Sequence, residues 1–137
     1  MYWVINTVIQ GSDFMSWNFT SDRPIYAQII EQMEIKICSG IYPLGSKLPS
    51  VRDLAKEASV NPNTMQRALS NMEESGLLYS VRTSGRFVTE DINMIKQTRK
   101  KIVQEQIEEF LKKMVDLGFE QKEIISMLSD MSKEMRK

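Results

Sequence analysis

The sequence predicts a mainly α-helical fold with a small β wing, followed by a short region of two further helices. Two short amphipathic helical patterns, separated by a tight polar joint, lie between residues 50 and 76. Two short β-like runs follow them. From residue 90 onward, apolar residues recur at steps of three and four. These observations predict a winged helix-turn-helix domain over residues 15–89 and a helical region over residues 90–137.

A first helix is predicted ahead of the helix-turn-helix, beginning near residue 25 and closed by Ser39-Gly40. Its apolar residues recur at steps of four: Ile25, Ile29, Met33 and Ile37. We expect it to pack as a scaffold behind the two helices that follow. The lone cysteine, Cys38, lies in this pattern and is expected to be a small core residue.

The second predicted helix begins after Ser50, which has Asp53 three residues later in the spacing of a capping box. Its apolar stripe consists of Val51, Leu54, Ala55 and Ala58. Arg52 and Lys56 are four residues apart and therefore share a different face of the helix.

The third predicted helix follows at once, because Asn61 is suited to cap it and Pro62 to occupy its first turn. Gly76 is expected to end it. Its apolar stripe is Met65, Ala68, Leu69 and Met72. A second stripe contains no acid and carries side chains that can bond base edges or phosphates: Asn63, Gln66, Arg67 and Ser70.

After Gly76, the runs LLYSV and RFVT predict a two-stranded wing. The four residues Arg82, Thr83, Ser84 and Gly85 join them as a turn with a basic tip.

The motifs in this stretch resemble the DNA-binding domain of the GntR family of bacterial transcription regulators. They are Leu48-Pro49-Ser50 with Arg52 and Leu54-Ala55, Val60 to Thr64 leading into Ala68-Leu69, Glu74 to Leu77, and Gly85 to Val88. The resemblance covers roughly residues 24–89, and the short helical remainder resembles the YtrA-like subfamily. Two positions depart from the family pattern: Pro62 stands where relatives often carry a basic side chain, and Thr83 replaces the first of two wing glycines.

The resemblance implies DNA contacts at Arg52, Asn61, Asn63, Gln66 and the wing tip around Thr83 and Gly85. With the polar stripe and the basic wing, the full set of candidate DNA-contacting residues is Arg52, Asn61, Asn63, Thr64, Gln66, Arg67, Arg82, Thr83, Gly85 and Arg86. The alternative for Arg52 is an exposed helix residue paired with Asp53 or Glu57, and for Gln66 a neutral position facing solvent. Considered together as one face beside a basic wing, these residues favour DNA binding.

Beyond Glu90, one long helix ending at Gly118 and a second over residues 120–135 are predicted. Two such helices cannot bury their apolar faces in isolation, so we expect them to form a homodimer. The candidate dimerisation residues are Val103, Ile107, Phe110, Met114, Leu117, Ile124, Leu128 and Met131. The methionines of this region also suggest an adaptable ligand-binding groove, but methionines at helical spacing are more often core.

Net charge over the 137 residues is zero, and the basic excess lies in the predicted DNA-binding stretch. Residues 46–89 hold six bases against four acids, whereas residues 90–137 hold ten of each. The chain has no histidine and one cysteine, which removes the usual zinc sites and the Ser-His and Cys-His nucleophile pairs. No cofactor or metal is therefore expected. No apolar run reaches the ~20 residues of a membrane span, and residues 1–14 are expected to be a leader that plays no part in the fold.

The predicted function is that of a sequence-specific transcriptional regulator, a repressor that binds double-stranded operator DNA as a homodimer on an inverted repeat in the cytoplasm. YtrA-like relatives imply an operon with a transport or envelope role. The alternative is a winged-helix module that binds another protein without reading DNA sequence. An enzyme is not expected. The sequence identifies no small-molecule effector, and we expect operator binding without one.

Overall fold

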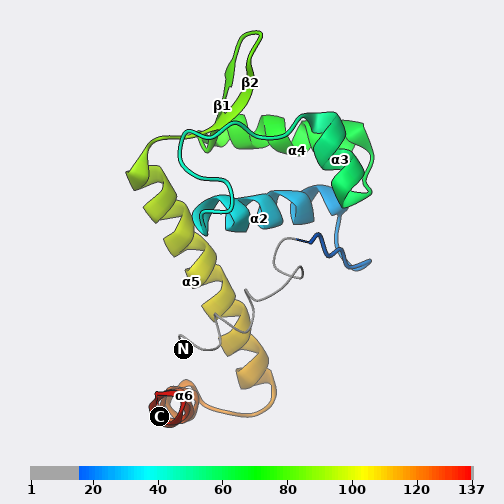
Figure 1. The fold of residues 1–137 in the computed structure, drawn as a ribbon. Helices are drawn as coiled ribbons and strands as arrows, with labels where there is room; N and C mark the ends of the chain where they lie inside the picture. The colour runs from blue at the N-terminus through cyan, green and yellow to red at the C-terminus, as the bar shows by residue number, and fades with distance from the viewer. Residues whose placement is uncertain (1–15, 137) are drawn as a thin grey trace. The chain divides into compact units, whose positions relative to one another are not determined.

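In a computed structural model of the chain, residues 16–136 are described, in the element order α2, α3, α4, β1, β2, α5 and α6 (Figure 1). The chain divides into two compact units, one comprising Met15–Arg99 and the other including Lys100–Lys137. The predicted mainly α-helical fold with a small β wing is confirmed. The predicted leader, residues 1–14, lies outside the described residues.

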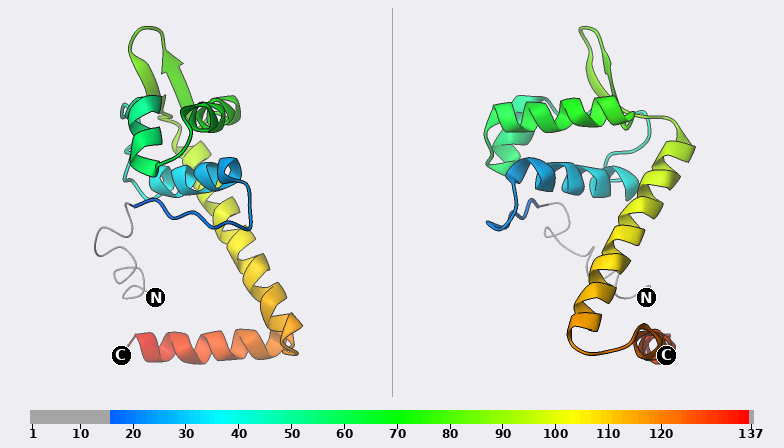
Figure 2. Two further views of the ribbon diagram at one scale, coloured as in Figure 1. Left: turned by 90° about the vertical axis from the view of Figure 1, so that its right-hand side faces the viewer. Right: turned by 180° about the vertical axis from the view of Figure 1, so that it is seen from behind.

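Helix α2, Ile25–Cys38, forms the scaffold that its steps of four predict. Ile29 and Met33 are fully buried, and α2 lies beside α4 in both orientations of the unit (Figures 1 and 2). Ile25 does not follow the prediction, because 37% of it is exposed at the first turn. Cys38 is buried, as expected, and burial raises the pKa of its thiol.

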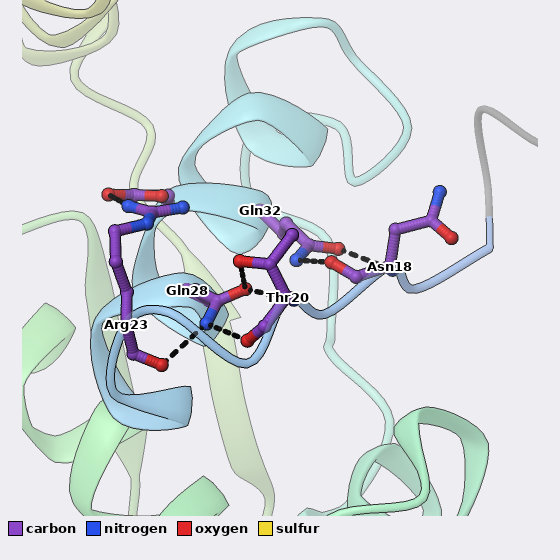
Figure 3. A network of polar contacts seen from close by, with 6 residues as sticks. Asn18, Thr20, Arg23, Gln28 and Gln32 are labelled. Carbon is purple, nitrogen blue, oxygen red and sulfur yellow. Dashed lines mark hydrogen bonds and ion pairs between the residues drawn. The ribbon is translucent and has the colours of Figure 1, made fainter.

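The residues ahead of α2 are held against it by amide side chains (Figure 3). The Gln28 side chain accepts a hydrogen bond from the backbone N–H of Thr20 and donates to the carbonyl oxygens of Thr20 and Arg23, at 2.8, 2.9 and 2.8 Å. One turn on, the Gln32 side chain bonds both backbone groups of Asn18. Because Gln28 is only 2% exposed, these bonds satisfy a polar group that would be costly to bury alone.

Helix α3, Val51–Ala58, and helix α4, Pro62–Ser75, begin at the predicted caps. The Ser50 side chain accepts a hydrogen bond from the backbone N–H of Asp53, and the Asn61 side chain accepts one from that of Asn63. Gly76 ends α4 with φ +92°, a conformation in which a Cβ is disfavoured. The core of the unit contains two residues of the wing, Leu78 and Val88, together with most of the predicted apolar stripes: Ile29, Met33, Ile37, Leu54, Ala55, Ala58, Met65, Ala68, Leu69 and Met72. Val51, also in the predicted stripe of α3, is only half-buried.

The wing is an antiparallel hairpin of β1, Leu78–Val81, and β2, Gly85–Val88, which projects from the C-terminal end of α4 (Figures 1 and 2). Gly85 belongs to β2 rather than to the turn, since it pairs with Val81. On the other side of β2, backbone bonds from Leu48 to Arg86 and from Val88 to Ser46 tie the wing to the chain that precedes α3.

Helix α5, Ile92–Asp116, is capped by the preceding Asp91, whose side chain accepts from the backbone N–H groups of Asn93 and Met94. Its first two turns belong to the Met15–Arg99 unit, where Ile95 is buried and Arg99 donates to the carbonyl oxygen of Cys38. The remainder of α5 and helix α6, Gln121–Met135, form the second unit. None of the helices among residues 16–136 combines the length and the hydropathy that a membrane span requires.

Candidate nucleic-acid interface

Helix α4 displays the predicted polar stripe on its outer side. Asn63, Gln66 and Arg67 are exposed, while the buried stripe of the same helix faces the core. Asn61 is exposed at the cap, and Thr64 is half-buried. The stripe is therefore accessible to a ligand.

On α3, Arg52 is exposed and makes no ion pair within the described residues, so the structure does not pair it with Asp53 or Glu57. The structure therefore does not support the alternative interpretation, in which a neighbouring acid pairs with Arg52. Arg52 presents an accessible cation near the start of α3.

The tip of the wing, residues 82–84, is exposed, and a backbone hydrogen bond from Ser84 to Val81 closes it as a β-turn. Thr83 has φ +69°, which is the left-handed value that the third position of a type II turn requires. Glycine or asparagine normally occupies this position. Thr83 departs from the family pattern, but its backbone still adopts the positive φ that the turn requires. Arg82 extends from this tip with no ion-pair partner among residues 16–136.

Arg86 differs from the other candidates because it is held by an acid that the sequence does not single out. Its Nε donates to Oε1 of Glu73 on the last turn of α4 at 2.5 Å, and Ser80 Oγ donates to the same oxygen. Burial acts to raise the pKa of the Glu73 carboxyl, but the hydrogen bonds from Ser80 and Arg86 prevail and hold that pKa below its ordinary value. Only 16% of the Arg86 side chain is exposed.

This cluster, defined as Glu73, Ser80 and Arg86, has one signal in the sequence. Ser80 lies opposite Arg86 in the hairpin. This pairing can be derived from the sequence, because the position of the turn fixes the register of the two strands. Sequence reasoning missed Glu73 because only the packing of the wing against α4 brings it within reach.

The side chain of Gln66 is bonded at both ends of its amide. Arg86 Nη1 donates to Gln66 Oε1 at 3.3 Å, and Gln66 Nε2 donates to Ser70 Oγ at 3.3 Å. Arg67, one residue on, instead lies over the ring of Tyr26 on α2, with its guanidinium carbon 4.8 Å from the ring centroid. The polar stripe is thus divided between a wing side at Gln66 and an α2 side at Arg67.

An open groove of about 600 Å³ lies between the start of α3 and the wing. Its lining includes two basic residues, one acid and part of the exposed turn: Lys47, Leu48, Pro49, Ser50, Val51, Asp53, Thr83, Ser84, Gly85 and Arg86. The Lys47 stem crosses Gly85 so closely that a Cβ there would lie 3.0 Å from Lys47 Cε. The flexible end of Lys47 could move aside, so the requirement for glycine at this position comes from its φ of +121°, which side chains rarely adopt.

A smaller hollow of about 310 Å³ lies between the end of α2 and the start of α5, lined largely by Ile37, Cys38, Leu44, Ile92 and Ile95. Among the described residues, no group of three or more acidic, cysteine or histidine side chains is placed to hold a metal ion.

In the second unit, the candidate dimerisation residues are largely exposed apolar side chains. Val103 and Ile107 are each 50% exposed, Phe110 is 39% exposed and Leu117 is 69% exposed. On α6, Leu128 and Met131 are also about half exposed, whereas Ile124 is only 4% exposed and Met114 is half-buried. The fold of the described chain thus leaves most of this set uncovered.

Three helices with a β wing, an exposed polar stripe on α4 and cations on α3 and the wing together define a winged helix-turn-helix DNA-binding protein. The family model "Bacterial regulatory proteins, gntR family" matches residues 25–88. The chain is 37% identical over 111 residues to the uncharacterized HTH-type transcriptional regulator YhcF of Bacillus subtilis, a match that covers 81% of this chain and 92% of that protein. This chain belongs to the GntR family of DNA-binding transcriptional regulators.

Two further relatives match more than half of the chain. The HTH-type transcriptional repressor YtrA of Bacillus subtilis is 37% identical over 92 residues, covering 61% of this chain and 71% of that protein. A solved GntR family transcriptional regulator from Listeria monocytogenes is 38% identical with a TM-score of 0.74, covering 82% of this chain and 98% of that one. The family and these relatives are transcriptional regulators rather than enzymes.

Proposed function

We propose that this protein is a sequence-specific transcriptional repressor of the YtrA-like type that binds an inverted-repeat operator as a homodimer. Helix α4 enters the major groove and the wing lies along the backbone or in the minor groove. The observation that carries the proposal is the exposed polar stripe of α4 beside a basic wing, in a chain similar to a protein named as a repressor. The bacterial chromosome as partner implies a cytoplasmic protein.

The proposed contact set divides by chemistry. Arg52, Arg67 and Arg82 supply positive charge for phosphates, while Asn63 and Gln66 supply paired donors and acceptors for base edges. Asn61, Thr64, Thr83, Gly85 and Arg86 complete the set at the helix cap, the first turn of α4 and the wing. Glu73, an acid beside the wing, is paired with Arg86 and so repels phosphate less than a free carboxylate would.

The homodimer is proposed because the second unit exposes apolar side chains at helical spacing. Exposed apolar groups of this density on two adjoining helices are unfavourable in water and are typical of an interface. Two copies joined there carry two α4 helices, and this is the arrangement that an inverted repeat requires. The type of operon that the protein controls remains a prediction from the resemblance alone.

Neither the family nor the relatives support the alternative of a protein-binding module that does not read DNA. The two functions differ in salt dependence, because phosphate contacts release counterions and protein contacts generally do not. Binding that weakens steeply as salt rises is therefore the expected result.

The proposal is tested by selecting duplexes from a random pool with the full-length protein and measuring affinity for the selected site at several salt concentrations. We expect Gln66→Ala to cost about 1–3 kcal/mol on that site and Arg52→Ala either to do the same or to reduce the salt slope by about one. Lys101→Ala, at an exposed cation of the second unit, is the control and should bind like the parent. If the pool yields no selected sequence, sequence-specific binding is wrong.

A further inference from the structure

The amide of Gln66 is fixed in one polarity. An exposed glutamine amide turns over at little cost, so it can present its oxygen and its nitrogen to a ligand in either order. Here Oε1 accepts from Arg86 and Nε2 donates to Ser70. Turning the amide over would set two N–H groups against a guanidinium, which has no acceptor.

Arg86 can fix the orientation of the Gln66 amide because Glu73 fixes the orientation of Arg86. Its Nε is bonded to Glu73, and Glu73 also accepts from Ser80, so the guanidinium plane is anchored between α4 and both strands of the wing. The planar fork of an arginine allows one nitrogen to hold the acid while a second reaches the amide. A lysine has only one nitrogen and cannot do both in a fixed geometry.

We propose that Arg86 is a positioning residue that sets the base preference of Gln66, and that the base read is adenine. This inference rests on the proposed function. With one lone pair used by Arg86 and one N–H used by Ser70, the amide keeps one acceptor and one donor side by side. That pair matches the N6 donor and N7 acceptor of adenine in the major groove, whereas guanine presents two acceptors there.

The order of the acceptor and the donor on the Gln66 amide also restricts how adenine can be oriented. The Gln66 acceptor lies toward the wing and its donor toward Ser70, so only one placement of adenine satisfies both bonds. The paired bonds to adenine N6 and N7 are thereby confined to one orientation of that base. Without Arg86, the amide has both orders available and this restriction weakens.

The candidate set from the sequence places Arg86 among the residues that touch DNA directly, and this role and the positioning role make different predictions. Removing a phosphate-binding side chain reduces affinity for every sequence and lowers the salt slope by about one. Removing a positioning side chain changes the preference at one base pair and leaves the slope unchanged, because the charge on Arg86 is already paired with Glu73.

The test selects duplexes from a random pool with the full-length parent, Arg86→Lys, Gln66→Ala and the double variant. Arg23→Lys is the matched control, since Arg23 also pairs with an acid, Glu31 at 2.6 Å, but lies outside the proposed contact set. Arg86→Lys should lose the adenine preference at the same base pair as Gln66→Ala, by about tenfold. The double variant should be no worse than Gln66→Ala, since the two act through one contact.

Arg23→Lys should retain the full profile, and Arg86→Lys should retain both the salt slope and the preferences at other base pairs. Should Arg86→Lys lose its fold by circular dichroism, Glu73→Gln releases the same guanidinium and takes its place. An unchanged profile, a uniform loss at all base pairs, or the loss of a guanine preference instead of an adenine one each overturns the inference. If the parent itself selects no sequence, the proposed function fails, and that result is separate because it is obtained before any variant is compared.

Discussion

The ammonium of Lys36 lies over the indole of Trp17, with Nζ 3.7 Å from the ring centroid. Lys36 is only 4% exposed, and burial lowers the pKa of its ammonium while the nearby Glu57 carboxylate opposes that shift. Trp17 also stacks on Phe19 at a centroid distance of 5.9 Å. An aromatic face thus compensates a buried cation on α2, and it comes from residues ahead of the first helix of the domain.

Trp17→Ala should lower the free energy of unfolding by about 1–2 kcal/mol, because a partly desolvated cation–π contact is worth about that much. Trp17→Phe should cost less. It keeps an aromatic face and removes the indole N–H, which is buried and has no hydrogen-bond partner among the described residues. Urea unfolding followed by circular dichroism measures both variants, and equal losses would show that the ring face is not what stabilises Lys36.

The cluster of Glu73, Ser80 and Arg86 should make stability depend on pH at acidic values. Because the folded-state pKa of Glu73 lies below its ordinary value, the contribution is complete above the ordinary value and is lost as pH falls through the folded-state value. Glu73→Gln should be less stable than the parent near neutral pH by at most about 1 kcal/mol, since the pair is partly exposed. The difference should disappear once the pH falls below the folded-state pKa of Glu73, where the carboxyl becomes protonated in both states.

The control for this experiment is Glu74→Gln, at the neighbouring exposed acid of the same helix turn. It should track the parent throughout the titration. Parallel pH profiles for the parent and Glu73→Gln, measured by chemical denaturation, would contradict the proposed contribution of the Glu73 carboxylate.

Thr83→Gly should stabilise the domain. A β-branched residue at φ +69° destabilises the folded state by about 1–2 kcal/mol, and glycine removes this strain. Glycine also gives the unfolded chain more backbone entropy, which offsets about 0.5–1 kcal/mol of the gain. The expected net gain is about 0.5–1 kcal/mol. Ser84→Gly is the matched substitution at the next position, outside the left-handed region, and should be neutral or destabilising. Thermal unfolding orders the three proteins, and a less stable Thr83→Gly would show that the Thr83 side chain makes a contribution larger than the strain.

Phe110→Ala should weaken the proposed homodimer. Truncating a large apolar side chain that is 39% exposed in the chain removes contact area from both copies, and a loss of about tenfold in dimer affinity is expected. Gln104→Ala, at an exposed polar position on the same helix, should dimerise like the parent. Sedimentation equilibrium over a range of concentrations measures both, and a parent that stays monomeric would show that the proposed homodimer is wrong.

Local sequence is sufficient to predict the helices of the DNA-binding domain, their ends and the wing. Side chains that cap or end a helix act within a few residues of where they stand, as Ser50, Asn61 and Gly76 do here. Periodicity likewise identifies the buried stripes of α3 and α4, because one face of a helix is set by spacing alone. The GntR family follows from the order of these same local motifs.

Which side chains are available to a ligand depends instead on tertiary packing. Arg52 and Arg86 are alike in the sequence, yet one makes no ion pair among the described residues and the other is bound to an acid on α4. The exposure of Ile25 and the contact between Lys36 and Trp17 are equally invisible in the sequence. Such features are set by how distant segments pack against one another rather than by local preference.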